Sequence, residues 1–84
     1  MTDDTSNDLT TSPITREIRA LRLEQQLSRA EFARRYGLDM RALQDWEQGR
    51  RTPDRAARML FRLIRMAPDQ VAQAALEEAT STII

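Results

Sequence analysis

Residues 27–53, LSRAEFARRYGLDMRALQDWEQGRRTP, carry the clearest signals of helix starts and ends in the chain. Ser28 is followed three residues later by Glu31, a capping box in which each side chain accepts a hydrogen bond from the other residue's free amide at a helix start. Gly37 then suits the left-handed residue that ends a helix, and Asp39 suits the cap of the next one. The stretch therefore predicts two short helices joined by a tight turn that contains a glycine.

Each of these two helices carries a narrow apolar face. The apolar positions are Phe32, Ala33 and Tyr36 in the first helix, and Leu43 and Trp46 in the second, which ends at Gly49. We interpret Trp46 as a core anchor, because proteins that stack bases on aromatic rings expose several of them and this chain has few.

A further helix is predicted before this pair, from Pro13 to about Gln26. Proline is tolerated at the first helical residue, and either Ser12 or Thr15 could cap it. Its core positions recur at helical spacing: Ile14, Ile18 and Leu21. We interpret its arginines as a solvated face, because acids are interspersed among them: Arg16, Arg19 and Arg22.

Two more helices are predicted after the pair. The fourth is capped by Thr52 and runs to about Met66, and a weaker fifth runs from Pro68 to about Ala79. The predicted core face of the fourth consists of Ala56, Ala57, Leu60, Leu63 and Ile64. Several apolar residues are left over and suggest a dimer interface if they are not merely scattered on the surface: Leu23, Met59, Phe61, Met66, Val71 and Leu76.

The expected fold class is therefore all-α, a five-helix bundle in one domain over residues 13–84. Residues 1–12 are expected to form a disordered acidic tail, because they contain too few apolar residues to offset the entropy lost on ordering.

Composition excludes several classes of function. The chain has no cysteine and no histidine, so thiolate or imidazole metal sites, disulfides and Ser-His-Asp chemistry are not expected. We expect no enzyme, no cofactor and no small-molecule ligand. No apolar run is long enough to cross a bilayer, so we expect a cytoplasmic protein that does not engage a membrane.

The net charge of zero conceals strong segregation along the chain. All 13 basic residues are arginines between Arg16 and Arg65, and this segment has seven acids, a balance of plus six. Arginine can bind guanine edges and phosphates through two parallel hydrogen bonds, which would suit a DNA-binding protein. Codon bias would equally explain why the chain has arginine and no lysine. The middle of the chain therefore remains compatible with a nucleic-acid partner.

The outer face of the second helix of the pair carries side chains that can contact base edges: Met40, Arg41, Gln44, Asp45 and Gln48. Arg41 suits guanine O6 and N7, Gln44 suits adenine, Asp45 could accept from cytosine N4, and Met40 could pack on a thymine methyl group. We predict that this helix reads double-stranded DNA.

The stretch resembles the Xre and Cro/C1-type helix-turn-helix family of bacterial and phage repressors, over about Ile18 to Ile64. The resemblance rests on Leu27, Ser28, Glu31, Ala33, Gly37, Leu43, Trp46, Glu47, Gly49, Arg50 and Pro53. It implies a lambda-repressor-like fold and a dimer whose two reading helices enter successive major grooves of operator DNA.

Family DNA contacts carry over onto a few further positions. Ser28 and Arg29 would lie beside the reading helix, although the family commonly has glutamine where Arg29 stands. Arg50 and Arg51 lie where the family contacts the phosphate backbone. Arg55, which begins a stripe of arginines on the fourth helix, is predicted from its position to contact phosphate as well. Where the family usually has Ser or Thr, this chain has Asp39, which would repel phosphate, so only its capping role is carried over.

Within the family, the chain is most similar to small HigA-like antitoxins, which share WEQGRR, a proline two residues later and a MAPD-like restart. That resemblance implies an autorepressor whose partner is a HigB-like ribonuclease toxin, and the acidic residues 1–12 would suit a basic toxin surface. Two alternatives stay open: a stand-alone Xre-type repressor without a toxin, and a protein-interaction adaptor that does not bind DNA.

Overall fold

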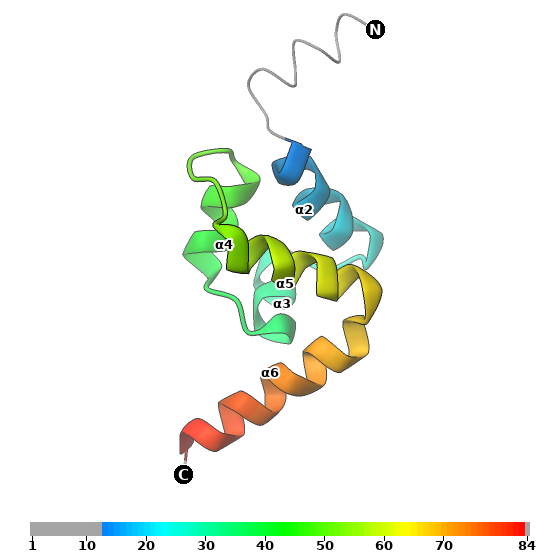
Figure 1. Ribbon diagram of the computed structural model, residues 1–84, viewed down its shortest axis with the longest axis vertical. Helices are drawn as coiled ribbons and strands as arrows, with labels where there is room; N and C mark the ends of the chain where they lie inside the picture. Colours follow the sequence, from blue (N-terminus) through cyan, green and yellow to red (C-terminus); the bar gives the residue numbers. More distant parts are fainter. Residues whose placement is uncertain (1–12, 84) are drawn as a thin grey trace, which may run out of the picture.

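The computed structural model describes residues 13–83 as five α-helices without a strand, which confirms the all-α fold (Figure 1). The predicted acidic tail, residues 1–12, lies outside the described residues, as does Ile84. The helices are α2 (Pro13–Glu24), α3 (Arg29–Tyr36), α4 (Met40–Glu47), α5 (Arg55–Met66) and α6 (Pro68–Ile83).

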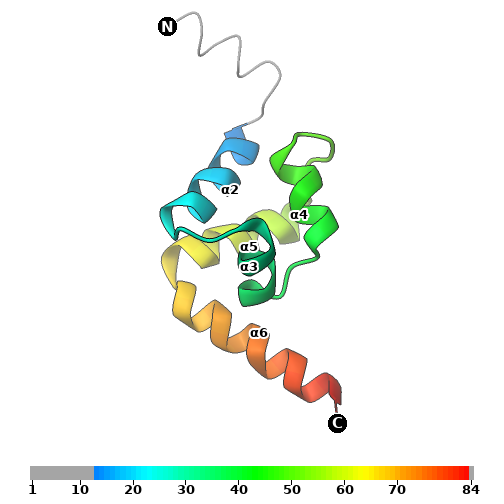
Figure 2. The ribbon, with the colours of Figure 1, turned by 180° about the vertical axis from the view of Figure 1, so that it is seen from behind.

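The helices surround one small core. α4 packs against α2 and α3, α5 contacts α2 and α6, and α6 also packs against α3. The far end of α6 leads away from the rest of the molecule in both views (Figures 1 and 2). The buried core consists of Ile18, Leu21, Phe32, Ala33, Tyr36, Leu43, Phe61 and Ile64.

The caps predicted from the sequence for α3 and α4 are present in the structure. Ser28 Oγ accepts from the Glu31 amide at 3.1 Å, and Glu31 Oε1 accepts from the Ser28 amide at 2.9 Å. These hydrogen bonds hold the pKa of Glu31 below its ordinary value. Gly37 adopts the left-handed conformation, with φ of 69°, and Asp39 accepts from the Ala42 amide at 2.9 Å. The capping box, the glycine turn and the second cap are thus confirmed.

Three helix boundaries differ from the sequence prediction. α5 is capped by Asp54, whose Oδ1 accepts from the Ala57 amide at 2.9 Å, and not by Thr52. α2 ends at Glu24, because Gln26 turns left-handed with φ of 59°. α6 runs beyond Ala79 to Ile83.

The core face of α5 is rotated from the predicted one. Phe61 is buried, whereas Leu63, which was predicted to face the core, is 48% exposed. The cause is aromatic packing: the Phe61 ring stacks with Phe32 at 6.4 Å between centroids and meets the Trp46 ring edge-on at 5.7 Å. Trp46 is partly buried and packs against the core, as predicted.

The largest difference between the structure and the sequence prediction concerns Arg22, whose side chain was expected to lie in solvent. Its side chain is only 12% exposed and holds the carboxylate of Glu47, which is fully buried. Arg22 Nε and Nη2 donate to the two Glu47 oxygens at 2.8 and 2.9 Å, and Arg29 Nε donates to Oε1 at 3.3 Å. Arg19 donates to the Glu47 carbonyl. This group of contacts ties α4 to α2 and to the start of α3.

We predict that Glu47→Gln lowers the free energy of unfolding by about 3 kcal/mol, because it leaves the largely buried Arg22 without its counter-charge. Chemical denaturation of both proteins measures the difference. A matched control, Glu31→Gln, changes an exposed acid in the capping box and should cost less. Equal losses in the two variants would contradict the special role of Glu47.

The same contact predicts a dependence of stability on pH. Burial raises the pKa of Glu47, but the hydrogen bonds and charges of Arg22 and Arg29 outweigh burial and leave the pKa below its ordinary value. A carboxyl whose pKa is lower in the folded state stabilises the fold above its unfolded pKa, about 4.3, and this contribution is lost as the pH falls through the folded pKa. Denaturation curves below pH 5 should therefore separate wild type from Glu47→Gln less than curves at pH 7.

Two glycines allow the packing of α6 to be tested. Gly37 and Gly49 both have positive φ, so alanine at either should cost about 1 to 2 kcal/mol in backbone strain. At Gly37 the added Cβ would also lie 3.2 Å from the Ala75 Cβ. We expect Gly37→Ala to destabilise more than Gly49→Ala in thermal or chemical denaturation. Equal losses in the two variants would mean that α6 moves aside at no cost.

Candidate nucleic-acid interface

The pair α3 and α4 forms a tight helix-turn-helix. The turn closes where the Leu38 amide donates to the Ala33 carbonyl at 2.8 Å, and Ala33 is buried. α4 directs its buried side to the core with Ala42, Leu43 and Glu47. Its other side faces outward, so the fold presents one side of an eight-residue helix at the surface.

The residues predicted to contact bases lie on or near that outward side. Met40 is 41% exposed, the Arg41 side chain is 79% exposed, and Gln48 is exposed at the end of the helix. Gln44 and Asp45 are half-buried. Arg41 and Met40 sit in the first turn of α4, which is the part that approaches base edges in DNA-bound helix-turn-helix proteins.

Asp45 gathers three arginines around α4. Its carboxylate lies 3.8 Å from Arg41 Nε, 3.9 Å from Arg50 Nη1 and 3.5 Å from Arg51 Nε. The Asp45 carbonyl also accepts from the Arg50 amide at 2.8 Å, which folds the loop after Gly49 back onto the helix. We call these four residues, Arg41, Asp45, Arg50 and Arg51, the Asp45 cluster.

The Asp45 cluster carries three cations and one anion on the exposed side of the motif. The Asp45 side chain is only 14% exposed, whereas those of Arg50 and Arg51 are 63% and 57% exposed. The sequence predicts that Asp45 contacts cytosine and that the loop arginines contact phosphate. Nothing in the sequence indicates that Asp45 and these arginines contact one another. The Asp45 contact with cytosine remains a prediction, and the structure shows a carboxylate already in contact with arginines.

Ser28 and Arg29 lie at the start of α3. The Ser28 hydroxyl accepts the capping hydrogen bond, and the residue is exposed. Arg29 is held through Nε by Glu47, with its side chain 32% exposed. Its predicted DNA contact would therefore use the remaining nitrogens of the guanidinium. In the sequence, Glu47 stands out only as part of the family pattern. The separation of Arg22 and Glu47 along the chain does not predict the ion pair between them.

A side chain of α5 holds the loop between α4 and α5. Pro53 is buried, and its carbonyl accepts from Arg58 Nη1 at 2.9 Å. Arg55 is exposed in the first turn of α5, beyond this loop. The predicted phosphate contact of Arg55 is compatible with that exposure and remains a prediction.

The described part of the chain holds neither a metal-binding cluster nor a membrane-spanning helix. Residues 13–83 contain no group of three or more His, Cys, Asp or Glu that could hold a metal ion. No helix among them is both long and apolar enough to span a membrane.

Comparison with known families identifies the motif. The family model HTH_3, described as Helix-turn-helix, matches residues 18–65, more than half of the chain and nearly the range of the resemblance seen in the sequence. No curated protein matches the chain. The matched residues run from the middle of α2 through α5 and contain the whole α3–α4 motif with the Asp45 cluster. The chain therefore belongs to the Xre and Cro/C1-type helix-turn-helix family and is a DNA-binding transcriptional regulator.

Proposed function

We propose that the chain is an antitoxin that binds its operator as a dimer, represses its own toxin–antitoxin operon and neutralises a HigB-like ribonuclease. The observation that carries the DNA-binding part is the Asp45 cluster, which places three arginines beside the outward face of α4. The alternative is a stand-alone Xre-type repressor, which the same cluster and the family match support equally.

In the proposed complex, α4 lies in the major groove. Arg41, the most exposed of the three cluster arginines, reaches guanine O6 and N7. Arg50 and Arg51 follow the helix and neutralise phosphates on the flanking backbone. Asp45 restrains these long side chains before DNA arrives, which reduces the conformational entropy lost on binding.

A dimer would place two copies of α4 in successive major grooves. Such grooves are separated by about 34 Å, so the operator would be a pseudo-palindrome with half-sites one turn apart. Footprinting that protects both half-sites supports this arrangement.

The toxin partner is proposed from the resemblance of the chain to HigA-like antitoxins. The MAPD-like restart of that resemblance falls at the junction of α5 and α6, where Pro68 begins the last helix. Residues 1–12 carry three acids and no base, a charge that suits the basic surface of a ribonuclease.

The division of roles between Arg41 and Arg51 gives one prediction. Arg41→Ala should relax specificity at one base position and cost about 1 to 3 kcal/mol of binding to the correct operator. Arg51→Ala should weaken binding to all sequences alike and reduce the salt slope by about 1. Binding titrations on the operator and its single-base variants, at several salt concentrations, measure both effects.

Arg34→Ala provides the matched control, because Arg34 is an exposed arginine on α3 outside the Asp45 cluster. It should change operator affinity less than either cluster variant. If Arg41→Ala and Arg51→Ala produced the same sequence-independent loss, the assignment of Arg41 to a base would be wrong.

Co-expression separates the two candidate functions. The chain is expressed with its adjacent reading frames, purified, and tested by gel shift on its upstream promoter. A complex with a small growth-inhibiting ribonuclease, together with a specific shift, is the result expected for an antitoxin. A specific shift without such a partner would favour the stand-alone repressor, and no shift at low salt would contradict both.

A further inference from the structure

Asp45 adjoins the outward face of α4, which would approach DNA. It follows Arg41 at the i,i+4 spacing, so the two side chains are neighbours on the helix surface. A carboxylate in this position repels the phosphates of any DNA sequence. The acid would therefore weaken DNA binding unless its charge serves another purpose in the motif.

Both carboxylate oxygens of Asp45 are in contact with arginines. Oδ1 lies 3.8 Å from Arg41 Nε and 3.9 Å from Arg50 Nη1, and Oδ2 lies 3.5 Å from Arg51 Nε. The Asp45 side chain is only 14% exposed. A cytosine amine would have to compete with these cations for the same two oxygens, so Asp45 is better placed to act on arginines than on a base.

The contact with Arg41 leaves its guanine-binding nitrogens available. It is made through Nε, so Nη1 and Nη2 lie beyond the contact on a side chain that is 79% exposed. These two nitrogens form the fork that binds guanine O6 and N7. An arginine held at Nε keeps this fork directed outward, whereas an unrestrained arginine can also turn toward phosphates.

We infer that Asp45 is a positioning residue that holds Arg41 for guanine and so contributes sequence specificity without touching a base. The inference rests on the proposed function, in which Arg41 reads a base. The charge of Asp45 lowers affinity for all DNA alike, while its contact restricts Arg41 to one kind of partner. The difference in affinity between the correct and the wrong base therefore increases.

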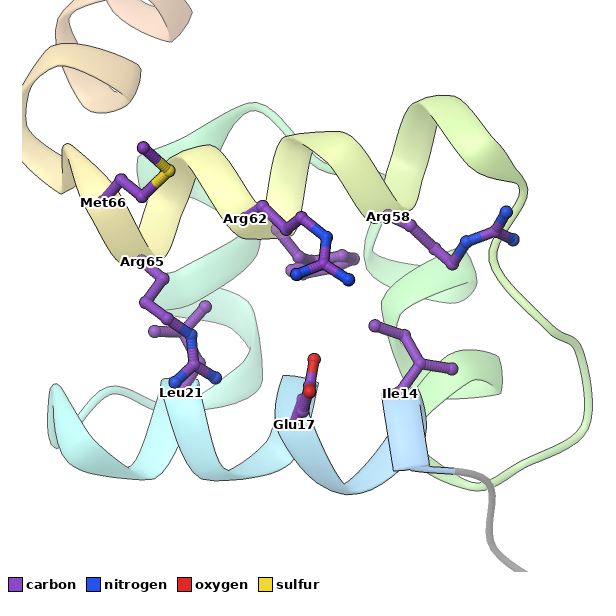
Figure 3. Close-up of a pocket in the computed structure, with 8 residues that line it drawn as sticks. Ile14, Glu17, Leu21, Arg58, Arg62, Arg65 and Met66 are labelled. Carbon is purple, nitrogen blue, oxygen red and sulfur yellow. The ribbon is translucent and has the colours of Figure 1, made fainter.

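A second group of arginines provides a comparison. Arg58, Arg62 and Arg65 of α5 line a groove with Glu17 of α2, whose carboxylate points toward α5 (Figure 3). Glu17 is exposed and, like Asp45, is an acid among arginines, but this groove is lined by α2 and α5 alone. Glu17→Ala and Asp45→Ala thus change the net charge equally, and only the second alters α4.

The test measures binding to the operator, and to operators with each base pair replaced in turn, for Asp45→Ala, Arg41→Ala and the double variant. Asp45→Ala should lower the preference at the base pair that Arg41→Ala identifies by about fivefold or more. It should also tighten binding to unrelated DNA and increase the salt slope by about 1. The double variant should lose no more preference at that base pair than Arg41→Ala alone, because Asp45 acts through Arg41.

Two control variants complete the comparison. Asp45→Asn keeps the shape of the side chain without its charge and should reproduce the loss of preference. Glu17→Ala should leave the preference unchanged. The Asp45 carbonyl, which accepts from the Arg50 amide at 2.8 Å, is retained in both Asp45 variants, so they should fold as the wild type does by circular dichroism.

The restraint on Arg41 is measured separately, without DNA. NMR relaxation of the Arg41 Nε–H group should show less motion in the wild type than in Asp45→Ala. Arg34, exposed on α3 outside the Asp45 cluster, is the reference and should not change.

A loss of preference at a different base pair would mean that Asp45 reads a base itself, as in the predicted contact with cytosine. That result, an unchanged preference, or an Arg41 that is equally mobile in both proteins would overturn the inference. If the wild type preferred no DNA sequence, the proposed function would be contradicted, whereas relaxation would still establish or exclude the restraint of Arg41 by Asp45.

Discussion

The Glu47 carboxylate is fully buried, and its contacts govern how α4 packs on the other helices. A fully buried carboxylate is costly unless charged hydrogen bonds compensate it, and Arg22 supplies two of them with a third from Arg29. α4 has only eight residues, too few to be stable as an isolated helix. Its position relative to α2 and α3 is therefore set by these contacts together with the core packing of Leu43.

The two acids of α4 act on opposite sides of the helix. Glu47 faces inward and fixes the helix to the body of the protein, while Asp45 faces the loop and draws Arg41, Arg50 and Arg51 together. A chain with no net charge can thus present a cationic surface, because Glu47 is buried beneath it and Asp45 is largely covered. The outward face remains available to a polyanion.

A similar separation of charge distinguishes the last two helices. α5 has four arginines and no acid, and α6 has three acids and no base. The contacts of α6 with α3 direct its far half away from α5. The arginines of α5 and the acids of α6 thus lie outside the α3–α4 motif.

Residues close together in the sequence specify the five helices, the Ser28 capping box, the left-handed turn at Gly37 and the helix-turn-helix family. Which of the three similarly spaced arginines in α2 is buried depends on packing between helices, because Arg22 pairs with Glu47, 25 residues away. It also decided the rotated face of α5, where aromatic contacts with Phe32 and Trp46 bury Phe61 in place of Leu63. Local patterns report hydrogen bonds within a few residues, whereas these choices depend on side chains that meet only after the helices pack.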